Sequence, residues 1–175
     1  MARFTTIKSL TVAALFVALS LSGCSSRTIR IAPHAELKDL DPIWTTAYIV
    51  RNHGYLVYDT LFAMDENYEP QPQMVDTWTT TTDKKIWVFT LRDGLKWHDE
   101  TPVTAEDCIA SLQRWGKRDG VGQRLFSNIT KIRAVDDKTF SIILKNADGF
   151  LLTSLAKMSS NVPFMMPKRI ADTDP

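Results

Sequence analysis

The fold is decided by the stretch Ile86-Trp87-Val88-Phe89-Thr90-Leu91-Arg92-Asp93-Gly94-Leu95-Lys96-Trp97-His98-Asp99 and the segment that follows it to Arg114. From Ile86 to Leu91, apolar and β-branched residues occupy both alternating faces, which predicts a strand covered on both sides. The pair Asp93-Gly94 tolerates positive φ, so a tight hairpin is expected to join this strand to a second one at residues 95–97.

A helix is expected soon after the hairpin. Thr104 can cap its first turn, and Asp107, three residues later, completes a capping-box pattern and places negative charge at the positive end of the helix dipole. Apolar residues then recur at helical spacing, and Gly116 is the expected end. The result is a strand–turn–strand–helix unit with an aromatic core, to which we assign Trp78, Trp87, Phe89, Trp97 and Trp115.

These residues resemble the family 5 extracellular solute-binding proteins, the peptide-binding receptors of bacterial ATP-binding-cassette (ABC) importers. The matching string covers residues 89–99 and continues at Pro102, at residues 104–107 and at residues 111–114. Many spaced matches in one register make the resemblance specific, unlike a single short motif.

Two positions depart from the family pattern. Glu100 stands where the family commonly has Gly, and Cys108 where it commonly has Val or Phe. Neither belongs to the hydrophobic framework, so the resemblance holds. The place of Cys108 on the apolar face of the expected helix predicts a buried, inert thiol.

The resemblance implies an α+β fold, the N-terminal part of a two-lobed receptor of the periplasmic-binding-protein class. Residues 28–45 are expected to contain a first-lobe strand, formed at residues 28–32, and residues 46–165 approximately the inserted accessory domain. Family members continue much further, so residues 28–175 are expected to be the N-terminal portion of a solute-binding domain, from a truncated product or a fragment.

The function implied is capture of a dipeptide or oligopeptide in a cleft, hinge closure around it and delivery to the membrane permease subunits. A monomer without a cofactor is expected. One alternative is a truncated lipoprotein that binds no ligand. Another is a family member that binds a nickel chelate, haem or an oligosaccharide, because nothing in these residues chooses among the ligands.

In the family, the segment just after the Asp41-Pro42 pair passes along the ligand cleft. By this resemblance, Trp44, Thr45 and Thr46 are the candidate ligand-binding residues. Hydroxyls and exposed backbone would bond a peptide main chain, and the indole would cover an apolar side chain. The alternative is that a threonine caps the helix expected at residues 46–58 while Trp44 packs in the core.

The N-terminal segment has the pattern of a lipoprotein signal peptide. Basic residues precede an uncharged apolar run at residues 10–21, which is too short to span a bilayer comfortably. Leu21-Ser22-Gly23-Cys24 resembles a lipobox. It predicts a signal peptide at residues 1–23, lipidation of Cys24, a tether at residues 24–27 and a periplasmic or cell-envelope location with a membrane anchor. The alternative is an ordinary secretory signal with an unrelated cysteine.

Composition and motifs argue against other classes of function. The net charge of +1 gives no reason to expect nucleic acid as a partner. His98, Asp99 and Glu100 are consecutive, so in an extended segment they point to opposite sides and cannot converge on one metal ion. No catalytic residue and no metal site is therefore assigned. A second polar group is interpreted as a solvated loop: His34, Glu36, Asp39 and Asp41.

The second half of the chain has weaker signals. A polar connection is expected at residues 117–122. Alternating apolar residues predict a second hairpin, with strands at residues 132–135 and 139–144 around Asp136-Asp137-Lys138. A short helix is expected at residues 148–158.

Overall fold

The computed structural model describes residues 28–174. The predicted signal peptide, Cys24 and the tether at residues 24–27 lie outside them. Residues up to Pro33 and residues from His34 form two separate units, and each is described by itself. No helix within the described residues is long and apolar enough to cross a membrane.

The strand expected at residues 28–32 is not formed. These residues are exposed and have no regular secondary structure. A strand needs a neighbour for its backbone N–H and C=O groups, and none of residues 28–174 pairs with this segment.

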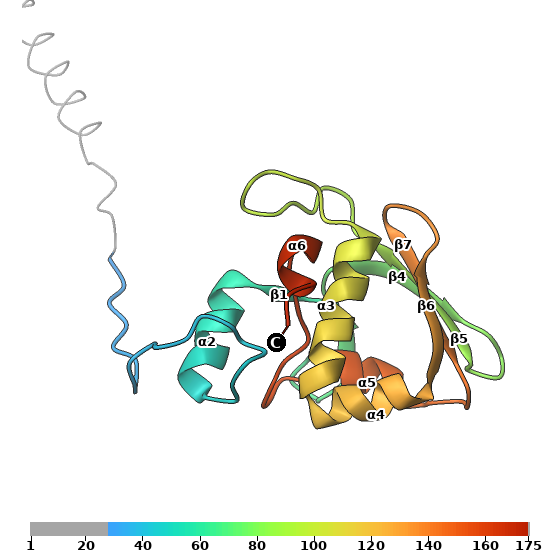
Figure 1. Cartoon of the computed structure of the whole chain (residues 1–175), viewed down its shortest axis with the longest axis horizontal. Coiled ribbons are helices and arrows are strands. Elements are labelled where there is room, and N and C mark those ends of the chain that lie inside the picture. Colours follow the sequence, from blue (N-terminus) through green and yellow to red (C-terminus); the bar gives the residue numbers. More distant parts are fainter. Residues whose placement is uncertain (1–27, 175) are drawn as a thin grey trace, which may run out of the picture. The chain divides into compact units, whose positions relative to one another are not determined.

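The unit from His34 onward is built on a four-stranded antiparallel sheet (Figure 1). The strand order is β4-β5-β7-β6, with bounds β4 Val75–Thr80, β5 Ile86–Leu91, β7 Thr139–Leu144 and β6 Ile129–Ala134. Strands β6 and β7 confirm the second predicted hairpin. The combination of this sheet with helices confirms the α+β fold class.

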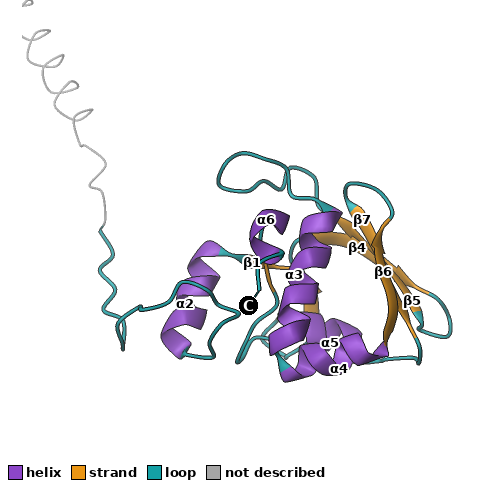
Figure 2. Ribbon diagram, viewed as in Figure 1, coloured by secondary structure: helices purple, strands orange, loops and turns teal. Residues whose placement is uncertain are grey.

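One face of the sheet carries the core. Trp87 and Phe89 of β5 lie opposite Ile142 and Phe140 of β7, and all four side chains are buried. The Phe89 and Phe140 rings stack with centroids 5.2 Å apart. The other face is more open, because Ile86 is 40% exposed and the helices lie on one side of the sheet (Figure 2). The expectation of a strand fully covered on both sides is wrong, and one covered face is ordinary for an antiparallel sheet.

The turn at Asp93-Gly94 is present, and Gly94 has φ +76°, but the first predicted hairpin is wrong. Both edges of β5 are already occupied, by β4 and β7. Residues 95–97 therefore cannot pair with β5. Lys96 instead forms an isolated bridge with Pro102, which closes a loop before the helix.

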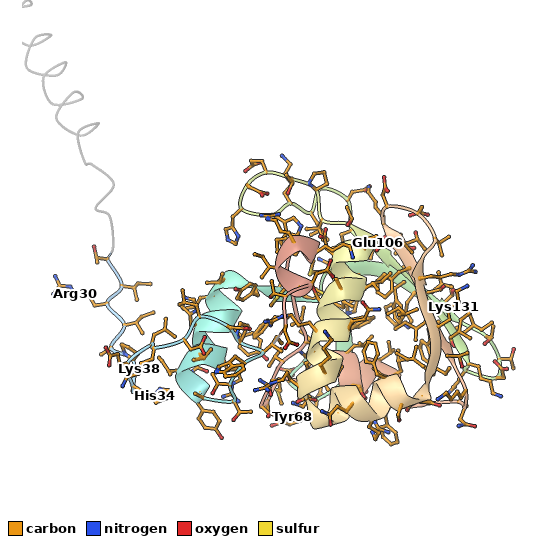
Figure 3. The ribbon with its side chains drawn as sticks, viewed as in Figure 1. Arg30, His34, Lys38, Tyr68, Glu106 and Lys131 are labelled. Atoms are coloured by element: carbon orange, nitrogen blue, oxygen red, sulfur yellow. The ribbon has the colours of Figure 1, made fainter. Side chains whose placement is uncertain are left out.

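Helix α3 (Ala105–Arg118) begins with the predicted capping box. The Asp107 amide donates to Thr104 Oγ1 over 3.3 Å, and the Thr104 amide donates to Asp107 Oδ2 over 2.8 Å. Figure 3 labels Glu106 in this first turn. Cys108 is buried in the same helix, and burial first, then the neighbouring Asp107 charge, raises the pKa of its thiol. This confirms the interpretation of an inert thiol.

Gly116 does not end α3. The helix continues to Arg118, and Asp119 then caps the next helix, α4 (Gly120–Asn128), by accepting from two of its amides. A Cβ at Gly116 would overlap the Phe126 ring. The glycine therefore allows α3 and α4 to approach closely, and the polar connection expected at residues 117–122 is replaced by two helix ends.

The expected aromatic core forms in part. Trp87, Phe89 and Trp115 are buried, and Trp97 is half-buried. Trp78 is 37% exposed on the edge strand β4, so its assignment to the core is wrong.

Shorter elements surround this unit. Helix α2 forms within the expected residues 46–58 and contacts β8, because Gly54 leaves room for the ring of Phe164. The helix expected at residues 148–158 is one short turn. The bounds are α2 Tyr48–Val57, β1 Asp59–Thr60, β2 Phe62–Met64, β3 Pro70–Pro72, α5 Leu151–Leu155, β8 Phe164–Met165 and α6 Lys168–Ala171; β1 pairs with β8 and β2 with β3.

Candidate functional site

The candidate ligand segment begins at a tight turn before α2. The Ile43 amide donates to Asp41 Oδ1 over 2.9 Å, and the Trp44 amide donates to the Asp41 carbonyl over 3.3 Å. The Ile43 side chain is buried in the core. These contacts anchor the turn at its first residues.

Helix α3 holds the turn through an ion pair. Arg114, which is 4% exposed, donates from Nη1 to Asp41 Oδ1 over 2.9 Å and from Nη2 to Asp41 Oδ2 over 2.7 Å. Burial alone would raise the pKa of Asp41, but bonds from Arg114 and the Ile43 amide, and the positive charge of Arg114, bring it below its ordinary value. Asp41 is therefore a structural partner of α3, and its interpretation as part of a solvated loop is wrong.

A second helix residue contacts the segment from the side. Arg118 donates from Nη2 to the Trp44 carbonyl over 2.9 Å, and its guanidinium lies 4.7 Å from the centroid of the Trp44 ring. Trp44 is 53% exposed, so the indole is not part of the core. A cation over its face orients the ring while leaving much of its surface in solvent.

The backbone carbonyls of the turn are occupied. Asn161 Nδ2 lies 3.2, 3.0 and 3.1 Å from the carbonyl oxygens of Pro42, Ile43 and Thr45, and Arg118 takes that of Trp44. These four oxygens face protein donors, so they are not available in this form to accept hydrogen bonds from a peptide main chain.

The groups that remain free lie at the end of the segment. Within residues 28–174, the amides of Thr45 and Thr46 and the Thr46 hydroxyl have no hydrogen-bond partner. The Thr45 hydroxyl accepts from the Ala47 amide over 3.2 Å. Ala47 is the N-cap of α2 and has no side-chain cap bond, so neither threonine caps the helix in the expected way. The segment can thus offer two N–H donors, one hydroxyl and an aromatic surface.

A separate hollow lies away from this segment. It has a volume of about 470 Å³ and lies between α3, α4, β6 and α6. Its lining includes Gln113, Lys117, Phe126 and Lys131, and Figure 3 shows Lys131 on β6. Trp44, Thr45 and Thr46 do not line it.

The His98-Asp99-Glu100 group forms an ordinary loop. Asp99 accepts from the Thr101 amide over 3.1 Å and from Arg169 over 2.8 Å, whereas Glu100 pairs with Lys96. The two carboxylates have different partners. No group of three or more His, Cys, Asp or Glu side chains within residues 28–174 is placed to hold a metal ion.

Two curated relatives cover most of this chain. It is 44% identical over 151 residues to the probable peptide ABC transporter periplasmic-binding protein y4tO of Sinorhizobium fredii, a match covering 86% of this chain and 28% of that protein. It is 35% identical over 146 residues to the periplasmic oligopeptide-binding protein OppA of Escherichia coli, covering 73% and 27%. The chain thus spans less than a third of the length of each relative. Both are periplasmic proteins by name, which supports the predicted location.

Solved structures of periplasmic binding proteins have the same fold. AgaA of A. tumefaciens R10, in complex with agropinic acid, matches with a TM-score of 0.66 and 25% identity over 77% of this chain and 27% of that one. DppA of Helicobacter pylori, in complex with the peptide STSA, matches with a TM-score of 0.64 and 22% identity over 76% and 29%. These matches confirm the expected fold class, that of one part of a two-lobed protein of the periplasmic-binding-protein class.

The family described as bacterial extracellular solute-binding proteins, family 5 Middle, matches residues 69–175, which is more than half of the chain. Its members are binding proteins, so the expectation that this chain is not an enzyme is confirmed. The chain belongs to the family 5 bacterial extracellular solute-binding proteins.

Proposed function

We propose that this chain contributes to the substrate-binding component of an ABC-type peptide importer. That component captures a peptide in a cleft, closes around it and delivers it to the permease subunits. Family membership and the names of the two relatives support the peptide as ligand. Because the chain spans under a third of each relative, the complete capture cycle is proposed for the receptor as a whole.

The proposal depends most on how Trp44, Thr45 and Thr46 are presented. The turn before them is bound to α3 and to Asn161, while the indole of Trp44 and the amides of Thr45 and Thr46 remain free. A rigid segment with free donors loses little conformational entropy when a ligand binds. The two amides would donate to peptide carbonyls, and Trp44 would cover an apolar side chain.

A binding experiment tests this role. Titration of the full chain with a pool of dipeptides to pentapeptides, followed by native mass spectrometry, should show saturable binding. Trp44→Ala should weaken binding by about tenfold, since a lost aromatic contact of 1–2 kcal/mol has that effect. The matched control is Trp78→Ala, which removes another partly exposed indole, on β4.

Each outcome has a distinct meaning. Equal affinity of wild type and Trp44→Ala would remove Trp44 from the site. A folded chain that binds no peptide would refute peptide binding by this chain. Binding of a nickel chelate, haem, an oligosaccharide or agropinic acid in place of peptide would change the ligand class and keep the family.

We also propose that Cys24 carries the lipid anchor that holds the protein at the membrane. Labelling cells with a fatty-acid analogue should mark the wild-type protein. Cys24→Ser should abolish the label, whereas Cys108→Ser, which changes a buried thiol, should retain it. Persistent labelling of Cys24→Ser would refute the anchor.

A further inference from the structure

Asn161 lies far from the ligand segment in sequence but is in direct contact with it in the folded chain. Its side-chain nitrogen contacts the carbonyl oxygens of Pro42, Ile43 and Thr45 at 3.2, 3.0 and 3.1 Å, and the residue is 6% exposed. A primary amide has only two N–H donors, so the three carbonyls must converge on one nitrogen and share them. Because the three oxygens must all lie around one nitrogen, the backbone from Pro42 to Thr45 can adopt few conformations.

Asn161 is itself held in place. Its backbone carbonyl accepts from Trp115 Nε1 over 2.9 Å and from Lys157 Nζ over 3.1 Å. Lys157 also forms an ion pair, at 2.8 Å, with the buried Asp119 that caps α4. The backbone of Asn161 is therefore held by a buried polar network that ties it to α3 and to the start of α4, and its side chain reaches the turn from this fixed point.

Asp41 with Arg114, and Arg118 at Trp44, also hold the turn. Within residues 28–174, however, Asn161 is the only donor to the carbonyls of Pro42, Ile43 and Thr45. Residues 42–46 form no helix or strand, so no regular backbone ladder holds them. Removing a donor here would leave several poorly solvated carbonyls without partners, which is costly enough to make the backbone rearrange. Rearrangement would turn the Thr45 and Thr46 amides and the Trp44 indole together.

We propose that Asn161 is the positioning residue of the ligand segment: it fixes the backbone from Pro42 to Thr45 and thereby sets the direction of the free groups at Trp44, Thr45 and Thr46. The ligand part of this inference rests on the proposed function, whereas the backbone part does not. Asn161 touches no ligand in this role. Its effect on affinity is exerted through the turn.

Two measurements on the full chain test the inference. Asn161→Asp replaces the side-chain NH2 group with a carboxylate oxygen of similar size, which repels the three carbonyl oxygens of the turn. Hydrogen exchange at the Ile43 and Trp44 amides should accelerate by about tenfold, the effect of losing roughly one net hydrogen bond, while exchange in β5 and β7 is unchanged. Asn161→Ser keeps one donor and should give an intermediate rate, and it replaces Asn161→Asp if that variant does not fold.

Ser111→Ala is the matched control. Ser111 is also buried, and its hydroxyl oxygen lies 2.7 and 3.0 Å from the carbonyl oxygens of Asp107 and Met166, which share its single proton and do not belong to the turn. It should lower global stability without changing exchange at Ile43 and Trp44. The second measurement is affinity for the peptide pool per folded molecule, which should fall by about tenfold in Asn161→Asp and stay at the wild-type value in Ser111→Ala.

Unchanged exchange at Ile43 and Trp44 in both Asn161 variants would overturn the inference. Faster exchange with wild-type affinity would overturn it as well, because the position of the turn would then not matter to the ligand. If the wild-type chain binds no peptide, the proposed function fails, and the exchange rates alone decide whether Asn161 positions the turn.

Discussion

Arg114 and Asp41 form a bidentate ion pair that joins the middle of α3 to the loop before α2, across 73 positions of sequence. The Arg114 Nε also donates to the Thr173 carbonyl over 3.3 Å. One buried guanidinium thus holds together three segments that are distant in the chain: the start of the ligand segment, the helix and the residues after α6.

Arg114→Met should lower the free energy of unfolding by about 3 kcal/mol, because it leaves a partly buried carboxylate without its partner. Urea denaturation measures the change. Adding Asp41→Leu should recover part of the loss, since the second substitution removes the unpaired charge. Strictly additive losses in the double variant would mean that the two residues are not coupled.

The same pair predicts a dependence of stability on pH. The pKa of Asp41 is below its ordinary value of 3.8, because bonds from Arg114 and the Ile43 amide outweigh the effect of burial. The unfolded carboxyl therefore binds a proton more readily than the folded one. The contribution of Asp41 to the free energy of unfolding is complete above the pKa that this carboxyl has in the unfolded chain. It is lost as the pH falls through the pKa that Asp41 has in the folded chain.

We therefore expect the stability of wild type to fall more steeply than that of Asp41→Asn between about pH 5 and pH 2. Urea midpoints measured at several pH values give the two slopes. Parallel slopes would mean that Asp41 titrates alike in the folded and unfolded chain.

The features that sequence predicted correctly have local causes. The capping box needs only Thr104 and Asp107, which are three residues apart. The β6–β7 hairpin needs two alternating runs around a polar turn. The strand β5 was evident from its β-branched and aromatic residues. In each case the residues that determine the structure are neighbours in the chain.

The errors have non-local causes. Residues 95–97 could not pair with β5 because β4 and β7, from elsewhere in the chain, occupy its edges. The linear pattern favours a helix end at Gly116, because the contact of this glycine with Phe126 is not visible in it. In the candidate site, the exposure of Trp44 agrees with the predicted role, but the residues that hold it, Arg118 and Asn161, were missed because no spacing connects them to it.

Asp107 has a larger structural role than that of a helix cap. Its carboxylate accepts from Trp97 Nε1, from the amide and hydroxyl of Thr104 and from the Lys168 amide, over 3.2, 2.8, 2.8 and 2.7 Å. Asp107→Ala should cost about 3 kcal/mol, because several donors lose their partner at once. Thr104→Ala should cost about 1 kcal/mol, the value of a cap. Equal losses of unfolding free energy in the two variants, measured by urea denaturation, would mean that Asp107 acts only as part of the helix cap.

Substitution by alanine should have opposite effects on stability at two glycines near the α3–α4 junction. Gly116→Ala places a methyl group against the Phe126 ring and should cost about 1–3 kcal/mol through overpacking. Gly120 begins α4 with open space where its Cβ would be, so Gly120→Ala should be neutral or stabilise by about 0.5 kcal/mol. Thermal denaturation of the two variants compares them. A neutral Gly116→Ala would mean that α3 and α4 can separate at no cost.

The sheet itself can be tested through two aromatic residues on neighbouring strands. Phe89 is fully buried between Phe62 and Phe140, so Phe89→Ala should cost about 3–5 kcal/mol and leave a cavity. Trp78 packs edge-on against Phe62 with its indole partly in solvent, so Trp78→Ala should cost only about 1–2 kcal/mol. Both losses are measured by urea denaturation. A loss below about 1 kcal/mol for Phe89→Ala would mean that the buried face of β5 does not carry the core. Helix α3, which supports the ligand segment, would then have to pack against other residues than those of β5.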